Sequence, residues 1–420
     1  MESFIISGKR PLSGVVKISG SKNAALPILA ATLLTDQKFI ISNVPDIRDI
    51  RTLLTLLEII GAEYTFEKNT VVIQTKKIKS TVLPSELVCD LRASLLLWAP
   101  LLARAGQVTS AYPGGCVLGK RSIRTHVEAL QEFGVRFSEK NGLLHFQANS
   151  GELRGKKFTL REFSVTGTEN VVMLASLAIG KTKVRLAATE PHVVDVCRFL
   201  KKMGAKISGA GTHVLVVEGV KKLKGARHEV IPDYLEVGVF TIAAIITGGR
   251  VTIKNIVPED LEIFWSLLRK IGAKFVVKKN SVTVSRAKKL VSCERLQTAI
   301  HPGFPTDLQA PFVVLLTQCK GESLVHETLF EDRFRYIPEL EKMGAHFDVL
   351  NPHQIIVSGP SILRGATVES CDIRAGAAVV LAALAARGTT TIRHIRYIDR
   401  GFERFDEKLR SIGAAIKRVH

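Results

Sequence analysis

The sequence of residues 91–106 is LRASLLLWAPLLARAG, and the same kind of segment recurs at residues 237–249 (VGVFTIAAIITGG) and 375–388 (AGAAVVLAALAARG). Each segment runs past ten residues and lacks a polar face, a pattern typical of a helix that is buried on all sides. A short strand pattern follows each segment: GQVTSA, GRVTI and GTTTIRHI. The chain is therefore expected to hold several buried helices, each leading into a strand.

The buried segments belong to an internal repeat. Each copy continues with an amphipathic helix, as in residues 47–60, where apolar residues recur at steps of three and four. A glycine supplies the left-handed stop of that helix, and a β-hairpin such as AKISGAGTHVLVVEG (residues 205–219) closes the copy. The closing glycines are separated by 73, 70, 68, 72 and 69 residues, at Gly61, Gly134, Gly204, Gly272, Gly344 and Gly413.

Six copies divide into three plus three at the polar, basic segment GVKKLKGARHEVIPD, Gly219–Asp233. The fold class that we expect is α/β, with two similar domains of three repeats each. In each domain, sheets and outer helices surround three buried helices. A cleft between two such domains is a usual place for a ligand.

Composition points to a protein of the cytoplasm. The chain has 420 residues, of which 46% are hydrophobic, and no apolar run reaches the ~18 residues that cross a membrane. The N-terminus MESFIISGKR lacks the pattern of a secretory signal. The six cysteines lie far apart without a CxxC pair, which favours free thiols in a reducing compartment and argues against a metal site.

The net charge of +20 concerns partners rather than fold. Aromatic residues make up only 6%, and the basic residues are scattered in pairs such as Lys76-Lys77 and Lys221-Lys222, so no basic stripe for nucleic acid stands out. Solvated surface is the simplest interpretation of these pairs. The positive electrostatic field of such a chain would also attract small polyanionic substrates.

The buried helices all begin near polar residues. Asp, Asn, Thr and Ser there are explained as caps that accept backbone N–H bonds. Capping does not explain the cations, because a positive charge is unfavourable at a helix N-terminus unless an anion is also bound. We therefore expect a trap for phosphate and carboxylate groups at these starts: Lys22-Asn23, Asp90 with Arg92, Thr168-Glu169-Asn170, Asp233 with Glu236, Asp307 with Gln309, and Asp372 with Arg374.

One loop departs from the repeat. From loop proline to closing glycine, the second copy spans 21 residues (Pro113 to Gly134), against 16, 13 and 14 in copies one, three and four. The extra length falls at YPGGCVLGKRS, which places Cys116 beside Lys120 and Arg121. Neighbouring cations lower the pKa of a thiol, so Cys116 is a candidate nucleophile or acid rather than a core residue.

With these residues the chain resembles the UDP-N-acetylglucosamine 1-carboxyvinyltransferases, a family of enolpyruvyl transferases in the EPSP synthase-like superfamily. The resemblance covers essentially the whole chain and implies an inside-out α/β barrel. It also implies that residues 22–230 form one domain, that residues 1–21 and 231–420 form the other, and that the active site lies in the cleft between them. The motifs that carry it are SGSKNAALP (19–27), LRAS (91–94), PGGCVLGKR (113–121), SVTGTENVVM (164–173), HPGFPTDLQA (301–310), ETLFEDRF (327–334), DIRA (372–375) and YIDRGFERF (397–405).

The implied reaction moves the enolpyruvyl group of phosphoenolpyruvate to the 3′-hydroxyl of UDP-N-acetylglucosamine and releases phosphate, the first committed step of peptidoglycan synthesis. It needs no cofactor or metal. By resemblance, Cys116 protonates carbon 3, and Asp307 contacts the attacking hydroxyl as base. Lys22 and Arg400 complete the catalytic set, and Asp372 adds to the polar floor. The phosphoenolpyruvate site comprises Lys22, Asn23, Arg121, Arg374 and Arg400.

The resemblance also implies the UDP-sugar site, with two departures. The family commonly has Pro, a small apolar residue and Asp after the position of Arg121, where this chain has Ser122, Ile123 and Arg124; Glu162 replaces a frequent basic residue. An Asp-to-Arg change replaces an acceptor with donors, so a related transferase with another acceptor stays open. A non-catalytic polyanion binder and an RNA-phosphate cyclase are weaker alternatives. The expected UDP-sugar residues are Arg92, Arg121, Ser122, Ile123, Arg124, Thr125, Ser164, Val165, Thr166, Asp307 and Leu329.

Overall fold

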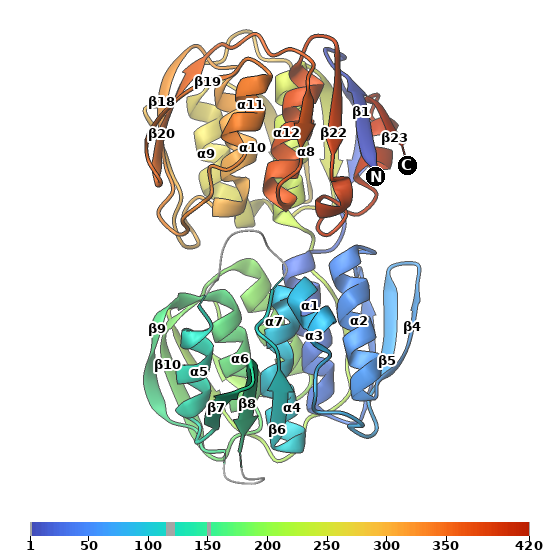
Figure 1. The fold of residues 1–420 in the computed structure, drawn as a ribbon, viewed down its shortest axis with the longest axis vertical. Coiled ribbons are helices and arrows are strands. Elements are labelled where there is room, and N and C mark those ends of the chain that lie inside the picture. Colours follow the sequence, from blue (N-terminus) through green and yellow to red (C-terminus); the bar gives the residue numbers. More distant parts are fainter. Residues whose placement is uncertain (1, 115–121, 149–152, 420) are drawn as a thin grey trace. The chain divides into compact units, whose positions relative to one another are not determined.

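The computed structural model describes residues 2–114, 122–148 and 153–419, and the chain divides into two compact units. The central unit is Gly20–Ile231, and the terminal unit combines Met1–Ser19 with Pro232–His420. Each unit has its own hydrophobic core, and the described residues form six sheets, three in each unit. Buried helices inside and sheets outside are the α/β arrangement that the repeat predicts (Figure 1).

The central unit is built from the first three repeats. Its buried layer is formed by α1, by the 3₁₀ helix η2 with α4, and by α6, which pack against one another. The outer helices α2, α5 and α7 are followed within three residues by Gly61, Gly134 and Gly204, with φ of 120°, 91° and 102°. The helices are α1 (Lys22–Ala31), η1 (Thr32–Leu34), α2 (Arg48–Ile60), α3 (Ser85–Asp90), η2 (Arg92–Leu97), α4 (Trp98–Ala105), α5 (Arg124–Gln131), α6 (Val165–Ala175) and α7 (Pro191–Lys202).

The sheets of the central unit are joined in a ring. In each, a hairpin pairs with the strand that follows the buried helix. In two of the three sheets a further strand pairs in parallel with that strand, β9 with β10 and β13 with β3. In the third sheet, the segment before β6 makes an isolated parallel bridge, Val82 to Thr109. The ring closes because β13, which follows the third hairpin, pairs in parallel with β3 of the first repeat. The strands are β3 (Lys38–Ser42), β4 (Glu63–Glu67), β5 (Thr70–Gln74), β6 (Gln107–Ser110), β7 (Arg136–Lys140), β8 (Leu143–Gln147), β9 (Lys157–Ser164), β10 (Lys181–Ala187), β11 (Lys206–Ser208), β12 (Val214–Glu218) and β13 (Arg227–Glu229).

The terminal unit repeats this plan around α8, α10 and α12, which pack on one another. Its outer helices α9, α11 and α13 each end two residues before a glycine, Gly272, Gly344 and Gly413, which again have positive φ of 82°, 92° and 96°. Glycine adopts positive φ at little energetic cost because it has no Cβ, which explains why glycine recurs at these positions of the repeat. The helices are α8 (Tyr234–Thr247), η3 (Pro258–Leu261), α9 (Glu262–Lys270), η4 (Thr306–Leu308), α10 (Gln309–Leu316), α11 (Ile337–Lys342), α12 (Ile373–Ala385), η5 (Ile395–Tyr397) and α13 (Phe405–Ser411).

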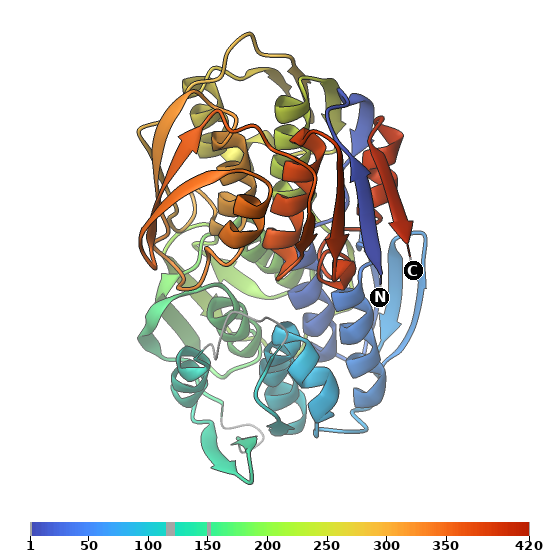
Figure 2. The same ribbon diagram turned by 45° about the horizontal axis from the view of Figure 1, so that its top comes forward.

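The N-terminus completes the ring of the terminal unit. Strand β1 lies between β22 and β23, in the position that the second hairpin strand takes in the other sheets (Figure 2). Strand β2 pairs in parallel with β14. It thus closes the ring of the terminal unit as β13, paired in parallel with β3, closes that of the central unit. The strands are β1 (Ser3–Ser7), β2 (Ser13–Lys17), β14 (Arg250–Lys254), β15 (Lys274–Lys278), β16 (Ser281–Ser285), β17 (Arg295–Gln297), β18 (Gly321–His326), β19 (His346–Asn351), β20 (Gln354–Gly359), β21 (Thr367–Glu369), β22 (Thr389–Arg393) and β23 (Ala415–Val419).

Two of the buried helices begin as 3₁₀ helices rather than as the uniform α-helices that the apolar pattern suggests. Helix α4 carries Pro100 in its first turn and follows η2, and α10 carries Pro311 and follows η4. Proline donates no hydrogen bond to the carbonyl four residues back, so the preceding turn closes with the tighter bonding of a 3₁₀ helix. In the described residues no helix is long and apolar enough to cross a membrane.

Candidate active site

Lys22 is the first residue of α1, where the side chain of Ser21 caps the helix by accepting from the Ala24 N–H. Its ammonium lies 2.8 Å from the carboxylate of Asp49, in the first turn of α2. Asp49 is buried and Lys22 is mostly so. A carboxylate of the neighbouring helix therefore offsets the charge of Lys22.

Arg92, at the start of η2, binds backbone on both sides of the segment that contains Cys116. Its guanidinium donates to the carbonyl of Pro113 at 3.3 Å and to that of Ser122 at 2.9 Å. Gly114 lies so close to helix α3 that an added Cβ would meet the Cys89 carbonyl oxygen at 1.9 Å. The predicted residues Cys116 and Arg121, with Lys120, lie outside the described residues.

The residues expected to contact the nucleotide, 122–125, lie at the start of α5, directly after the segment that Arg92 contacts. The Ser122 hydroxyl accepts from the Arg124 N–H at 3.1 Å, and Ile123 is buried. Arg124 pairs with Glu128 one turn along α5, at 2.7 Å, and Thr125 donates to Glu162 at 2.6 Å. The two departures from the family pattern, Arg124 and Glu162, thus contact residues of α5 itself.

Ser164, Val165 and Thr166 form the start of α6. Ser164 caps the helix by accepting from the Gly167 N–H at 3.1 Å, and the Thr166 hydroxyl contacts Nε2 of His126 at 3.2 Å. The ring of His126 is fully buried and also contacts Asn170. Burial, followed by the charge of Arg92, lowers the pKa of His126 to about 3, so this imidazole is neutral.

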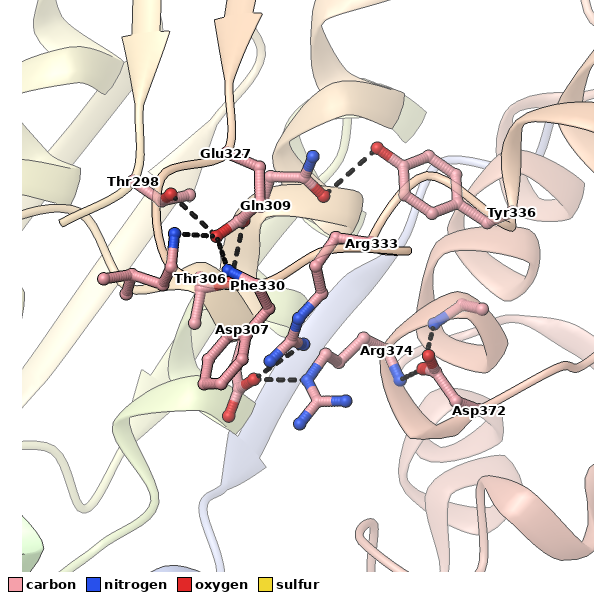
Figure 3. A network of polar contacts seen from close by, with 12 residues as sticks. Thr298, Thr306, Asp307, Gln309, Glu327, Phe330, Arg333, Tyr336, Asp372 and Arg374 are labelled. Carbon is pink, nitrogen blue, oxygen red and sulfur yellow. Dashed lines mark hydrogen bonds and ion pairs between the residues drawn. The ribbon is translucent and has the colours of Figure 1, made fainter. Parts of the chain in front are cut away.

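Asp307 is the centre of the second group, in the terminal unit. Its Oδ1 accepts from Nη1 of Arg333 at 3.2 Å and from Nε of Arg374 (Figure 3). Arg374 is held at the start of α12, where the Asp372 carboxylate caps the helix by accepting from the backbone N–H groups of Arg374 and Ala375. Two guanidinium groups from different repeats therefore bind one carboxylate oxygen.

Leu329 lies in a tight turn after β18. Its N–H donates to Glu327 Oε1 at 3.0 Å, and the next N–H, that of Phe330, donates to the same oxygen at 3.3 Å. Arg333 returns to this turn and places its guanidinium 4.6 Å from the centre of the Phe330 ring. Leu329 and Asp307 thus lie in one connected network.

Two further predicted residues lie at other points of the two units. Asn23 follows Lys22 in the first turn of α1, where it is partly exposed. Arg400 is buried in the turn between η5 and α13. Its neighbour Asp399 is fixed by two hydrogen bonds from Arg418 of β23, at 2.9 and 2.7 Å.

The predicted helix starts are corrected in three places. Helix α6 begins at Val165, so Thr168, Glu169 and Asn170 lie inside it and are buried, because Ser164 supplies the cap. Asp90 ends α3 and does not cap η2, and Asp307 lies within η4. The capping expected of Asp233 and Asp372 is confirmed, since each accepts from two backbone N–H groups.

The cations at the predicted helix starts contact protein groups in the structure. Lys22 and Arg374 are bound by protein carboxylates, and Arg92 is bound by protein carbonyls. Each of these three basic side chains is therefore oriented by a protein partner.

Sequence reasoning missed Asp49, Glu327, Arg333 and His126. Glu327 and Arg333 both belong to the quoted motif ETLFEDRF, which was the available signal. Asp49 and His126 had none, because an amphipathic helix places charged and aromatic residues at many positions. Among the described residues, no group of three or more His, Cys, Asp or Glu side chains could hold a metal ion.

Comparison with known proteins agrees with the motifs. A family model described as EPSP synthase (3-phosphoshikimate 1-carboxyvinyltransferase) matches residues 6–409. The UDP-N-acetylglucosamine 1-carboxyvinyltransferase of Treponema denticola is 41% identical, with 99% of both chains covered. The enzyme named UDP-N-acetylglucosamine 1-carboxyvinyltransferase 2 of Carboxydothermus hydrogenoformans is 44% identical over the full length of both.

Solved structures confirm the fold class. The enolpyruvyl transferase NikO from Streptomyces tendae has a TM-score of 0.90 at 24% identity, covering 100% of this chain and 99% of that one. An EPSP synthase from Acinetobacter baumannii has a TM-score of 0.78 at 18% identity and covers both chains fully. The α/β architecture with many small sheets is therefore the fold of the enolpyruvyl transferases, the inside-out α/β barrel.

Proposed function

The chain belongs to the EPSP synthase family, and from that premise we propose that it is a UDP-N-acetylglucosamine 1-carboxyvinyltransferase. It transfers the enolpyruvyl group of phosphoenolpyruvate to the 3′-hydroxyl of UDP-N-acetylglucosamine and releases phosphate. The observation that carries this proposal is an identity of 41% and 44% to relatives of that name over practically the whole chain. A likeness confined to the fold would leave the acceptor open, because one fold hosts several activities.

Phosphoenolpyruvate brings a phosphate and a carboxylate, and the proposed donor site supplies cations for both. We assign Lys22, Arg121, Arg374 and Arg400 to this role, with Asn23 as a polar contact. The described cations are held by their own partners, Lys22 by Asp49 and Arg374 by Asp307. Such anchoring orients a cation before the substrate arrives, which is how preorganised charge stabilises a transition state.

The acceptor hydroxyl must lose a proton while its oxygen bonds to carbon 2 of phosphoenolpyruvate. We assign this contact to Asp307, a carboxylate whose Oδ1 binds Arg333 and Arg374. Arg92, Ser122, Ile123, Arg124, Thr125, Ser164, Val165, Thr166 and Leu329, with Arg121, make up the proposed UDP-sugar site. Of these, Thr166 and Leu329 are oriented by buried groups, His126 and Glu327.

Carbon 3 must gain a proton in the addition and lose one in the elimination that expels phosphate. We assign the donor role to Cys116, on the loop between the two carbonyls that Arg92 binds. The proton taken from the hydroxyl and the proton given to carbon 3 then balance the addition. Removal of a proton from carbon 3 and departure of phosphate restore the double bond.

The enzyme name places this reaction in peptidoglycan synthesis. We therefore propose a part in cell wall biogenesis and, through it, in cell shape, cell cycle and cell division, at work in the cytoplasm. The transferase with a different acceptor is the less favoured alternative. It rests on the departures Arg124 and Glu162. In the structure, Arg124 pairs with Glu128 of α5, and Glu162 accepts a hydrogen bond from Thr125 of α5.

Phosphate release from phosphoenolpyruvate tests the proposal directly. Purified protein should release phosphate when UDP-N-acetylglucosamine is present and only at background rate without it. If phosphate were released from phosphoenolpyruvate with another sugar nucleotide but not with UDP-N-acetylglucosamine, the result would support the alternative acceptor. A protein that binds DNA or RNA with steep salt dependence and releases no phosphate would fit the polyanion binder instead.

A further inference from the structure

Glu327 is a fully buried carboxylate at the end of β18, and four donors converge on it. Oε1 accepts from the Thr298 hydroxyl at 3.0 Å and from the N–H groups of Leu329 and Phe330 at 3.0 and 3.3 Å. Oε2 accepts from the Thr306 hydroxyl at 2.8 Å. Burying a charge is costly unless hydrogen bonds compensate for the lost water, and here they come from three separate segments.

The two oxygens of Glu327 hold two different parts of the proposed acceptor site (Figure 3). Oε1 fixes the backbone of the turn that carries Leu329. Oε2 fixes Thr306, the residue directly before Asp307 and the first residue of η4. One side chain therefore sets the separation between a residue proposed to line the UDP-sugar site and the proposed base.

The contacts around Glu327 form a closed circuit. Glu327 binds the Phe330 N–H, the Phe330 ring lies under the guanidinium of Arg333, and Arg333 donates to Asp307. Asp307 follows Thr306, which returns to Glu327. A circuit leaves fewer independent motions than an open chain of contacts, so the carboxylate of Asp307 is held from both sides.

We infer that Glu327 is a positioning residue for the acceptor half of the reaction, acting through Thr306 on Asp307 and through the 329–330 turn on the UDP-sugar. The inference rests on the proposed function and deepens it. A displacement of about 1 Å at a reacting group can lower the rate by about a hundredfold, so a residue that never touches substrate can govern catalysis in this way.

The sharpest test removes one hydroxyl. Thr306→Val keeps the shape of the side chain and deletes the bond to Oε2, while Thr306→Ser keeps the hydroxyl. Thr317→Val is the matched control, because Thr317 is a buried threonine at the other end of α10 whose hydroxyl donates to Val314. Glu327→Gln probes the carboxylate itself, and the threonine variants decide the matter if that protein does not fold.

The expected result is a loss specific to the acceptor. Thr306→Val should lower kcat/KM for UDP-N-acetylglucosamine about tenfold while the KM for phosphoenolpyruvate stays within about twofold, as befits one lost hydrogen bond to a charged group. Thr306→Ser should restore activity to within about twofold of the parent protein. Thr317→Val should leave both kinetic constants unchanged.

Three results would overturn the inference: normal kinetics for Thr306→Val, a loss no larger than that of Thr317→Val, or a rise of more than about twofold in the KM for phosphoenolpyruvate. Any of these would mean that Glu327 only stabilises the terminal unit. Failure of the proposed function looks different, because the unmodified protein would then release no phosphate with UDP-N-acetylglucosamine.

Discussion

Arg374, which we assign to phosphoenolpyruvate, donates its Nε to Oδ1 of Asp307, which we assign to the attacking hydroxyl. Arg374 lies in α12 of the sixth repeat and Asp307 in η4 of the fifth, directly before α10, and α12 and α10 pack side by side. A cation proposed for the donor site and a carboxylate proposed for the acceptor site thus form one ion pair. We expect this ion pair to couple the binding of phosphoenolpyruvate at Arg374 to the position of the Asp307 carboxylate.

Replacing Arg374 by Gln should impair both halves of the reaction. The variant loses a cation for phosphoenolpyruvate and one of the two guanidiniums on Asp307. We expect kcat/KM for both substrates to fall about a hundredfold, the usual cost of one preorganised donor in a site. Steady-state kinetics with each substrate varied in turn provides the measurement. A loss for phosphoenolpyruvate alone would show that Asp307 does not depend on this pair.

Replacing Asp49 by Ala should raise the KM for phosphoenolpyruvate about tenfold, because Lys22 loses the partner that fixes its ammonium at 2.8 Å. Asp46→Ala is the matched control. Asp46 pairs at 2.7 Å with Arg51, but both side chains are about half exposed, and such a pair contributes little. A KM that falls in Asp49→Ala would mean that Asp49 screens Lys22 rather than positioning it.

Thiol-directed epoxides that mimic phosphoenolpyruvate should label Cys116. Burial is the first cause that raises the pKa of Cys293 and Cys371, and it raises the pKa of Cys197 and Cys319 to about 12, so these four thiols supply little thiolate. Cys89 is exposed and serves as the internal comparison. Peptide mass spectrometry after partial labelling gives the order of reaction, and an adduct first on Cys89 would refute the assignment.

Cys116→Ala should abolish phosphate release and leave the fold intact. The sequence around Cys116 lies outside any apolar pattern, so we expect the free energy of unfolding to change by less than about 0.5 kcal/mol. Thermal unfolding and the phosphate assay on the same preparation check the two halves of this statement. Residual turnover near that of the parent protein would rule out Cys116 as the proton donor.

His126 should make the central unit less stable in acid. Its pKa is about 3 in the folded chain, mainly because of burial, against about 6.5 in an unfolded chain. A lowered pKa gives stability that is complete above pH 6.5 and is lost as the pH falls toward 3, by up to about 1.4 kcal/mol per pH unit.

His126→Gln isolates this contribution, because glutamine does not titrate. The free energy of unfolding of the parent protein should fall more steeply between pH 6.5 and about pH 4.5 than that of the variant. Urea unfolding at several pH values supplies both curves. Parallel curves would show that the unfolded chain and the folded chain bind the proton at His126 equally well.

Local patterns in the sequence were enough to predict the helices and strands and part of the candidate site. The closing glycines, from Gly61 to Gly413, have the left-handed backbone that a helix stop requires. The segment 237–249 lies in the buried helix α8, as its lack of a polar face predicts. The start of α6 was misplaced by a few residues, because a serine cap is a weak signal beside an apolar run.

What the sequence determined by itself is therefore the repeat, its buried helices and the family, since each is written in residues that are neighbours along the chain or in motifs quoted from it. What only the tertiary structure decided is which charged groups meet. Arg374 reaches Asp307 across 67 positions, and Thr306 reaches Glu327 across 21. Long-range ion pairs depend on how helices pack, and a chain with 59 basic and 39 acidic residues allows far too many pairings for composition to select one.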